Sequence, residues 1–128
     1  MELSTVLLVD DDDSIRMIGE LALTEVGGWT VHTASSGLDA LQVAQTESID
    51  AILLDVMMPG LDGIETLSRL KQSEMTRAIP VIFMTAKVLP GEVGTYIEAG
   101  ALGVIAKPFD PMALPSEISA ILRTEGQN

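Results

Sequence analysis

Residues 51–63 read AILLDVMMPGLDG. The stretch begins with four apolar residues that favour a strand. It then reaches a single carboxylate, Asp55, and continues into a turn rich in proline and glycine. A buried strand that carries one acid at its carboxyl end holds that acid rigidly at a surface. We therefore expect Asp55 to be the reactive group, and we judge other candidate residues by whether they meet it.

Other apolar runs along the chain are similar, and helical patterns separate them. The five strands are predicted at residues 5–9, 29–34, 49–54, 81–84 and 101–106. The helices are predicted from Asp12 or Asp13 to Gly27, from Ser35 through Ala44, after Gly63, at about 91–99, and from Pro111 to about Arg123. Apolar strands that alternate with helices predict an α/β fold, a doubly wound five-stranded parallel sheet. We expect a single domain over residues 1–128, with its core at about 4–123.

Apolar residues recur at helical spacing in the first three helices. They are Ile15, Ile18, Leu21, Ala22 and Val26, then Leu38, Leu41 and Ala44, then Ile64, Leu67 and Leu70. In the last helix Pro115 removes one backbone donor. We expect either a loose first turn from Pro111 or a true start near Pro115.

Composition and charge restrict the classes of function. The 128 residues carry a net charge of −12, which repels nucleic-acid phosphates and anionic lipid and argues against direct nucleic-acid binding. Cysteine is absent, which excludes disulfides and thiolate metal sites. We find neither a signal-peptide pattern nor an apolar run as long as a membrane span, so we expect a cytoplasmic protein.

Polar residues follow the predicted strands at the points where these end: Asp10 and Asp11, Asp55, Thr85, and Lys107. The carboxyl ends of the strands are the ligand-binding edge of a doubly wound sheet. Three carboxylates there repel one another unless a cation or protons intervene, and all-oxygen ligation favours Mg²⁺, with Mn²⁺ as an alternative. A carboxylate beside Mg²⁺ and a lysine is suited to attack phosphorus and form an aspartyl phosphate.

The chain resembles a response-regulator receiver domain of the chemotaxis-regulator type over essentially its whole length. The matching segments are VLLVDDDDSIR, ILLDVMMPGLDG, VIFMTA and EAGALGVIAKPF, in this order. The combination of the D-x-x-M-P-x-x-D-G segment with the acids, the threonine and the Lys-Pro pair is specific, whereas each piece alone is weak. The resemblance implies a flavodoxin-like sheet of order 2-1-3-4-5 with five helices.

The resemblance also implies a role for each matching position. Asp55 resembles the phosphoacceptor, Asp11 the direct Mg²⁺ ligand and Asp10 an acid that acts mainly through water. The backbone carbonyl of Met57 matches a further metal ligand. Thr85 and Lys107 match the pair that contacts the phosphoryl group, with help from the Ala86 amide, and the Lys107-Pro108 peptide is expected to be cis.

Two positions depart from the family pattern. Val104 stands where family members usually carry an aromatic switch residue, so an inward-turning ring cannot couple to Thr85. We expect a signal to travel instead through Thr85 and residues 87–91, with Tyr96 as a reporter. Apolar Met57 cannot orient an attacking water by hydrogen bonding, so we expect slow self-hydrolysis of the phosphoryl group.

The resemblance implies a signalling switch and not an enzyme acting on an external substrate. The phosphoryl donor would be a sensor histidine kinase or a phosphotransfer protein. The downstream target would be a protein that binds the face formed by the fourth helix, the fifth strand and the fifth helix. Because no output domain follows Arg123, we expect the chain either to act alone or to come from something longer.

A rival interpretation is a haloacid-dehalogenase-like phosphohydrolase with Asp10 as nucleophile, since residues 7–12 loosely fit its strand followed by D-x-D. Such enzymes also need a late acidic pair and usually a cap domain, and neither is found here. Plainer roles suffice elsewhere: Asp12 and Asp13 for a helix cap or solvated charge, Asp62 for a turn, and the lone His32 for structure or surface.

Overall fold

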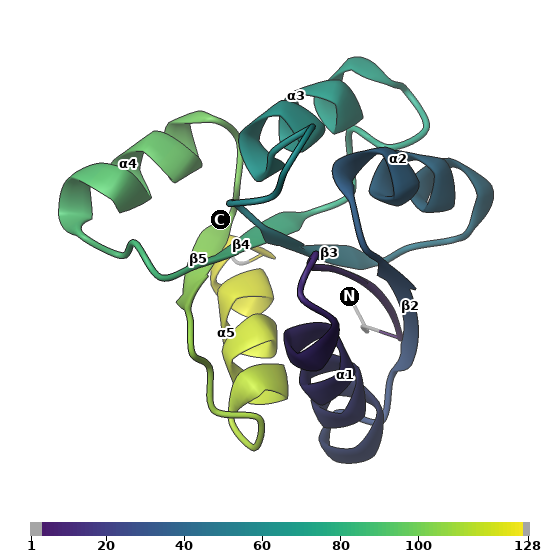
Figure 1. The fold of residues 1–128 in the computed structure, drawn as a ribbon, viewed down its shortest axis with the longest axis vertical. Coiled ribbons are helices and arrows are strands. Elements are labelled where there is room, and N and C mark those ends of the chain that lie inside the picture. The colour runs from purple at the N-terminus through teal and green to yellow at the C-terminus, as the bar shows by residue number, and fades with distance from the viewer. Residues whose placement is uncertain (1–3, 127–128) are drawn as a thin grey trace.

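The computed structural model describes residues 4–126, in which five parallel strands alternate with five α-helices (Figure 1). The strands are β1 (Thr5–Val9), β2 (Thr30–Ala34), β3 (Ala51–Asp55), β4 (Val81–Thr85) and β5 (Gly103–Ala106). The helices are α1 (Asp13–Leu21), α2 (Gly37–Thr46), α3 (Gly63–Gln72), α4 (Pro90–Glu98) and α5 (Leu114–Gly126), and a π-helical turn, η1 (Ala22–Val26), continues α1. The predicted alternation is confirmed, although β3 and β5 begin at Ala51 and Gly103, later than predicted.

The sheet has the order β2-β1-β3-β4-β5, and all of its pairs are parallel. Helices α1 and α5 cover one face, and α2, α3 and α4 cover the other (Figure 1). The predicted doubly wound, flavodoxin-like sheet is therefore confirmed. Strand β1 pairs with both β2 and β3, so the direction of winding reverses beside β1. This reversal opens a crevice at the carboxyl ends of the strands.

Two apolar layers, one on each face of the sheet, form the core. Leu7 and Val9 of β1 face the layer under α2 and α3, whereas Val6 and Leu8 face the layer under α1 and α5. Strands β3 and β4 are buried along their whole length. Because both faces are covered, these strands are apolar without a break, and only their last residues carry polar groups.

Of the apolar stripe predicted for α1 and the turn η1 that continues it, only Ala22 is buried. Ile18 is 46% exposed and Leu21 55%, whereas Gly19, Ala22 and Leu23 face the core. A Cβ on Gly19 would lie 2.8 Å from Leu8 Cδ2, so the helix contacts the sheet closely along its smallest residue. Tight backbone approach at Gly19, together with the burial of Leu23, sets which face points inward.

Helices α2 and α5 also refine the expectations. In α2, Ala40 and Ala44 are buried, but Leu38 is 64% exposed and lies on the outer side. Residues 111–113 form a turn, and α5 begins at Leu114. Of the two alternatives for this helix, the start near Pro115 is therefore correct, because a proline in the first turn has no backbone partner to lose.

Side chains at loop ends fix where helices and strands begin. Asp12 caps α1, Ser36 caps α2 and Asp62 caps α3, each accepting a hydrogen bond from a backbone N–H of the first turn. Hydrogen bonds from the Thr5 N–H and from Ser4 lower the pKa of Asp50, which ties the start of β1 to the loop before β3. Within residues 4–126, no helix is long and apolar enough to cross a membrane.

Candidate functional site

The sheet register brings the strand-end residues together. Asp10 follows β1 directly, Asp55 ends β3, Thr85 ends β4 and Lys107 follows β5. Val9 is paired with Leu54, Asp55 with Met84, and Thr85 with Ala106. Parallel, in-register strands therefore deliver these four polar side chains to one edge of the sheet, as their positions in the sequence predict.

Three carboxylates gather at this edge. Asp10, Asp11 and Asp55 each offer an oxygen atom within 4.8 Å of the others. Asp10 is fully buried and Asp55 is 3% exposed, whereas Asp11 lies at the surface. Oxygen atoms of carboxylates suit a hard cation such as Mg²⁺, so the donor set fits the metal that the sequence predicts. Asp12 and Asp13 lie outside this cluster.

The Lys107 ammonium lies between the two buried carboxylates. Its Nζ is 3.0 Å from Asp10 Oδ2 and 3.4 Å from Asp55 Oδ1. The other oxygen of Asp10 accepts a hydrogen bond from the Asp12 N–H at 2.9 Å. The Lys107-Pro108 peptide is cis, as predicted. The Lys107 ammonium, which follows β5, thus contacts the carboxylates at the ends of β1 and β3.

The surroundings shift the pKa of both Asp55 and Lys107. Burial and then the neighbouring charge of Asp10 raise the pKa of Asp55 from 3.8 to about 6, although Lys107 and the Met57 N–H oppose them. Burial by itself would lower the pKa of Lys107, but its hydrogen bond to Asp10 and the charges of both acids outweigh it and raise that pKa. Asp55 is thus a carboxylate that gains from a nearby positive charge.

The remaining predicted residues surround the carboxylates. Thr85 is buried, and its hydroxyl accepts a hydrogen bond from the Lys87 N–H at 3.0 Å, which holds the start of the β4–α4 loop. Ala86 follows it at the surface. The Met57 side chain is 62% exposed. Of this residue, only the backbone is held in place by the loop that follows Asp55.

Gly63 is a site residue that sequence reasoning treated only as part of a turn. A Cβ at this position would lie 2.5 Å from the carbonyl oxygen of Asp55 and 2.7 Å from Val56 Cα. The Gly63 N–H donates to the Val56 carbonyl at 2.9 Å. The start of α3 thus lies directly against the backbone that carries Asp55. The glycine after Asp62 was the only signal, and it does not reveal this contact.

The switch position and its neighbours lie behind the site. Val104 of β5 is paired with Phe83 of β4, and both belong to the core layer that contains Tyr96. The rings of Phe83 and Tyr96 meet edge to face with centroids 5.4 Å apart. Tyr96 is only 4% exposed, so it is a buried contact between α4 and β4. His32 is not part of this site. Its Nε2 lies 3.7 Å from Glu47 Oε1 near the surface.

Comparison with known proteins agrees with this geometry. Residues 6–119 match the family described as the response regulator receiver domain. Among curated relatives, the chain is 39% identical over 93% of its length to the transcriptional regulatory protein AfsQ1 of Streptomyces coelicolor, covering 51% of that protein. It is 41% identical over 92% of its length to the alkaline phosphatase synthesis transcriptional regulatory protein PhoP of Bacillus subtilis, covering 48%. The chain thus spans about half the length of these relatives.

Solved structures share the whole fold. The chemotaxis response regulator CheY4 of Vibrio cholerae has a TM-score of 0.87 and 31% identity, with 94% of this chain and 99% of that one covered. A putative response regulator from Chloroflexus aurantiacus has a TM-score of 0.85 and 36% identity, with coverages of 95% and 99%. The chain belongs to the response-regulator receiver domains of two-component systems. The alternative of a haloacid-dehalogenase-like phosphohydrolase finds no support in these matches.

The raised pKa of Asp55 predicts a gain in stability when its charge is removed. The folded state holds the Asp55 proton more tightly than the unfolded state does. The contribution of this group to stability is therefore present at low pH and is lost as the pH rises from about 4 to about 6. At pH 7.5 in EDTA, Asp55→Asn should raise the free energy of unfolding in urea by about 1 to 2 kcal/mol. The gain should shrink toward zero below pH 4.

Asp62→Asn is the matched control, because asparagine caps a helix as well as aspartate does. Its stability should equal that of the wild type at both pH values. An Asp55→Asn protein that is no more stable than the wild type at pH 7.5 would contradict the prediction.

Proposed function

We propose that Asp55 accepts a phosphoryl group from the phosphohistidine of a sensor histidine kinase or a phosphotransfer protein. The protein then acts as a phosphorylated switch and not as an enzyme on an external substrate. The observation that carries this proposal is the position of Lys107 Nζ, 3.0 Å from Asp10 and 3.4 Å from Asp55, within a cluster of three carboxylates. We take residues 1–128 as a single receiver domain that works in the cytoplasm.

Different residues of the site act on different atoms during the transfer. An oxygen of the Asp55 carboxylate forms the new bond to phosphorus while the bond from phosphorus to the histidine nitrogen breaks. Lys107 neutralises charge on the transferred group, and the Thr85 hydroxyl and the Ala86 N–H donate to its oxygens. Mg²⁺ or Mn²⁺, when bound by the carboxylate cluster, would supply further neutralisation of the charge on the transferred group.

The metal ligands would be Asp11, Asp55 and the backbone carbonyl of Met57, with Asp10 acting mainly through water. The bonding of Asp10 supports this division. One of its oxygens accepts from the Asp12 N–H and the other from Lys107, whereas Asp11 is exposed. A carboxylate whose two oxygens are already occupied is better placed to hold a metal-bound water than to bind the metal directly.

The output of the switch would be a changed affinity for a downstream protein at the face of α4, β5 and α5. This face adjoins the site, because Thr85 begins the loop to α4 and Lys107 follows β5. Leu89 is 70% exposed there and Ile97 45%, which offers apolar contacts to a protein partner. With a net charge of −12, the domain itself is unsuited to direct contact with nucleic acid.

Incubation with acetyl phosphate and Mg²⁺ tests the acceptor directly. Intact-mass spectrometry should show one added phosphoryl group on the wild type and on Asp62→Asn, an acid of the same loop with a capping role. Label should be lost in Asp55→Asn, because Asp11 lies at the surface and both carboxylate oxygens of Asp10 already accept hydrogen bonds. Loss of label in Asp10→Asn with retention in Asp55→Asn would overturn the proposal in favour of Asp10 as nucleophile.

Thr85 tests the route of the signal. Without an aromatic ring at position 104, movement of the Thr85 hydroxyl toward the phosphoryl group must break its bond from the Lys87 N–H and release the loop to α4. Beryllofluoride should therefore shift the amide NMR signals of α4 and β5 in the wild type and in Thr46→Ala, a control on the distant α2. These shifts should be lost in Thr85→Ala, and full shifts in that variant would contradict the route.

Met57 tests the lifetime of the phosphoryl group. Its exposed thioether chain cannot orient a water for attack, whereas an asparagine amide can donate and accept hydrogen bonds. Met57→Asn should therefore shorten the half-life of the phosphorylated form, by about tenfold if the amide acts as an effective positioning group. The comparison is Met75→Asn, since Met75 is 70% exposed and lies in the α3–β4 loop. Equal half-lives for Met57→Asn and the wild type would refute the expectation.

A further inference from the structure

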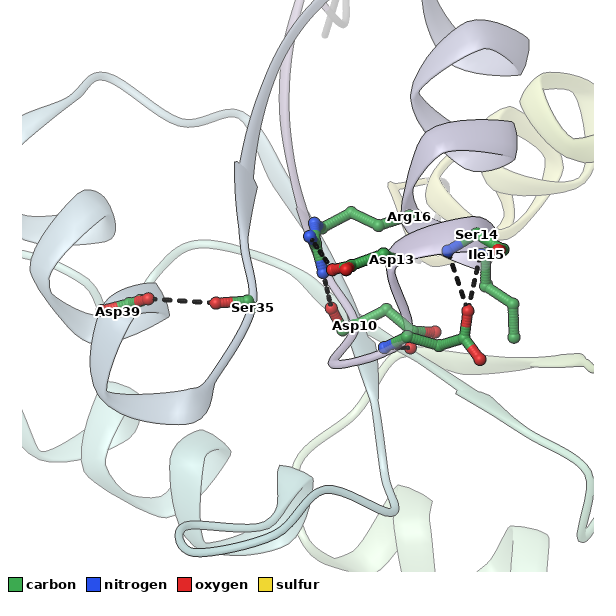
Figure 2. Close-up of polar contacts among 8 residues, drawn as sticks. Asp10, Asp13, Ser14, Ile15, Arg16, Ser35 and Asp39 are labelled. Atoms are coloured by element: carbon green, nitrogen blue, oxygen red, sulfur yellow. Dashed lines mark hydrogen bonds and ion pairs between the residues drawn. The ribbon is translucent and has the colours of Figure 1, made fainter.

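Arg16 is an arginine of α1 that the proposed chemistry leaves without a role. Its Nη1 donates to the backbone carbonyl of Asp10 at 2.7 Å, and its Nη2 donates to the carboxylate of Asp13 (Figure 2). The side chain is 20% exposed, so it lies largely against the protein. One planar guanidinium thus joins the first and last residues of the acidic run that follows β1.

The four consecutive aspartates of this loop divide among three environments. The Asp12 carboxylate accepts from the N–H groups of Ser14 and Ile15, which places it at the start of α1. Asp13 pairs with Arg16 on the same helix. Only Asp10 and Asp11 remain in the cluster with Asp55. The helix cap and the arginine thereby keep two of the four acids away from the carboxylate cluster.

Arg16 differs from an ordinary ion pair on one helix because it bonds a backbone carbonyl, that of Asp10, in addition to a carboxylate. Asp10 is held by four bonds: its N–H to the Ala34 carbonyl, its carbonyl from Arg16, and its two carboxylate oxygens from the Asp12 N–H and Lys107. The backbone of the residue before Asp11 therefore has a fixed orientation, and the direction of the Asp11 side chain follows from it.

We propose that Arg16 is a positioning residue for the cation site. Through the Asp10 carbonyl it fixes the β1–α1 loop so that Asp10 and Asp11 face Asp55, and through Asp13 it keeps a fourth carboxylate out of the cluster. The inference rests on the proposed function, since it concerns the same divalent-cation site. Groups that orient metal ligands from behind commonly change metal affinity by tenfold or more when they are removed.

The sign of the effect separates positioning from simple charge. If Arg16 acted only as a nearby positive charge, its removal would strengthen binding of a divalent cation to the acidic cluster. If it positions the ligands, its removal weakens binding in spite of the added negative charge. A purely structural role would lower the free energy of unfolding and leave the cation affinity unchanged.

The experiment is titration of the full chain with Mn²⁺, with free ion measured by electron paramagnetic resonance. Arg16→Ala should bind Mn²⁺ about tenfold more weakly than the wild type. Arg16→Lys should lie between them, because an ammonium keeps the charge but not the two-armed geometry. The double variant R16A/D13N restores the wild-type net charge and should remain weak.

Arg77→Ala is the matched control, since Arg77 forms an equivalent pair with Glu74, three residues before it, away from the site. It removes the same charge and should leave Mn²⁺ affinity within twofold of the wild type. Urea unfolding in EDTA reports the stability of each variant separately. If Arg16→Ala does not fold, the comparison is made with Arg16→Lys.

The outcomes assign any failure to one of the two proposals. The positioning role is overturned if Arg16→Ala, or Arg16→Lys in its place, binds Mn²⁺ as tightly as the wild type or more tightly. The cation site is unaffected by that result, provided that Asp11→Asn and Asp55→Asn weaken binding. If neither Asp11→Asn nor Asp55→Asn changes Mn²⁺ binding, the proposal of the cation site itself is overturned, and the role of Arg16 with it.

Discussion

The structure depends on one partly buried ammonium between two buried carboxylates. Asp10 is fully buried and Asp55 nearly so, and two such charges repel each other strongly where water is scarce. Lys107, reaching from the end of β5, contacts both and makes the arrangement tolerable. Burial and, after it, the charge of Asp10 keep the pKa of Asp55 raised to about 6 in spite of Lys107. The same burial and repulsion that cost stability would favour a cation at this cluster, as the proposed function requires.

Close backbone contacts hold these charges in place. Gly63 allows α3 to begin against the carbonyl of Asp55, and Gly19 allows α1 to lie against Leu8 of β1. Both acids therefore come from backbone segments that have little room to move. Arg16 adds a polar contact of the same kind at the Asp10 carbonyl. A site whose ligands are fixed from behind loses little conformational entropy when a cation binds.

The site is coupled to one side of the sheet by strand geometry. Side chains two residues apart in a strand project to the same face, so Thr85 and Phe83 both point toward the layer under α3 and α4. Phe83 contacts Tyr96 of α4 edge to face and is paired with Val104 of β5. Under the proposed switch, a change at Thr85 would reach α4 and β5 through these packed neighbours. With valine at position 104, this path runs through strand and loop contacts, and no ring rotation is needed.

The sequence by itself determined the sheet and the membership of the site. Apolar runs that end in acids, a threonine and a lysine specify parallel strands and place their polar ends at one edge, because in-register parallel strands end together. Asp10, Asp11, Asp55, Thr85 and Lys107 were all identifiable on this ground. The cap of α1 was predicted as Asp12 or Asp13 from local chemistry, since a cap bonds only to its own first turn, and the structure has Asp12 there.

Only the tertiary structure decided how close the elements lie and which helix face turns inward. Ile18 and Leu21 have the spacing of a buried stripe and are exposed, whereas Gly19 and Leu23, outside that stripe, are buried, because close contact with β1 sets the inward face. The contact of Gly63 with Asp55 and that of Arg16 with the Asp10 carbonyl were likewise invisible in the sequence. Patterns of residue type record local preference and burial, whereas distances between backbones exist only once the elements have packed.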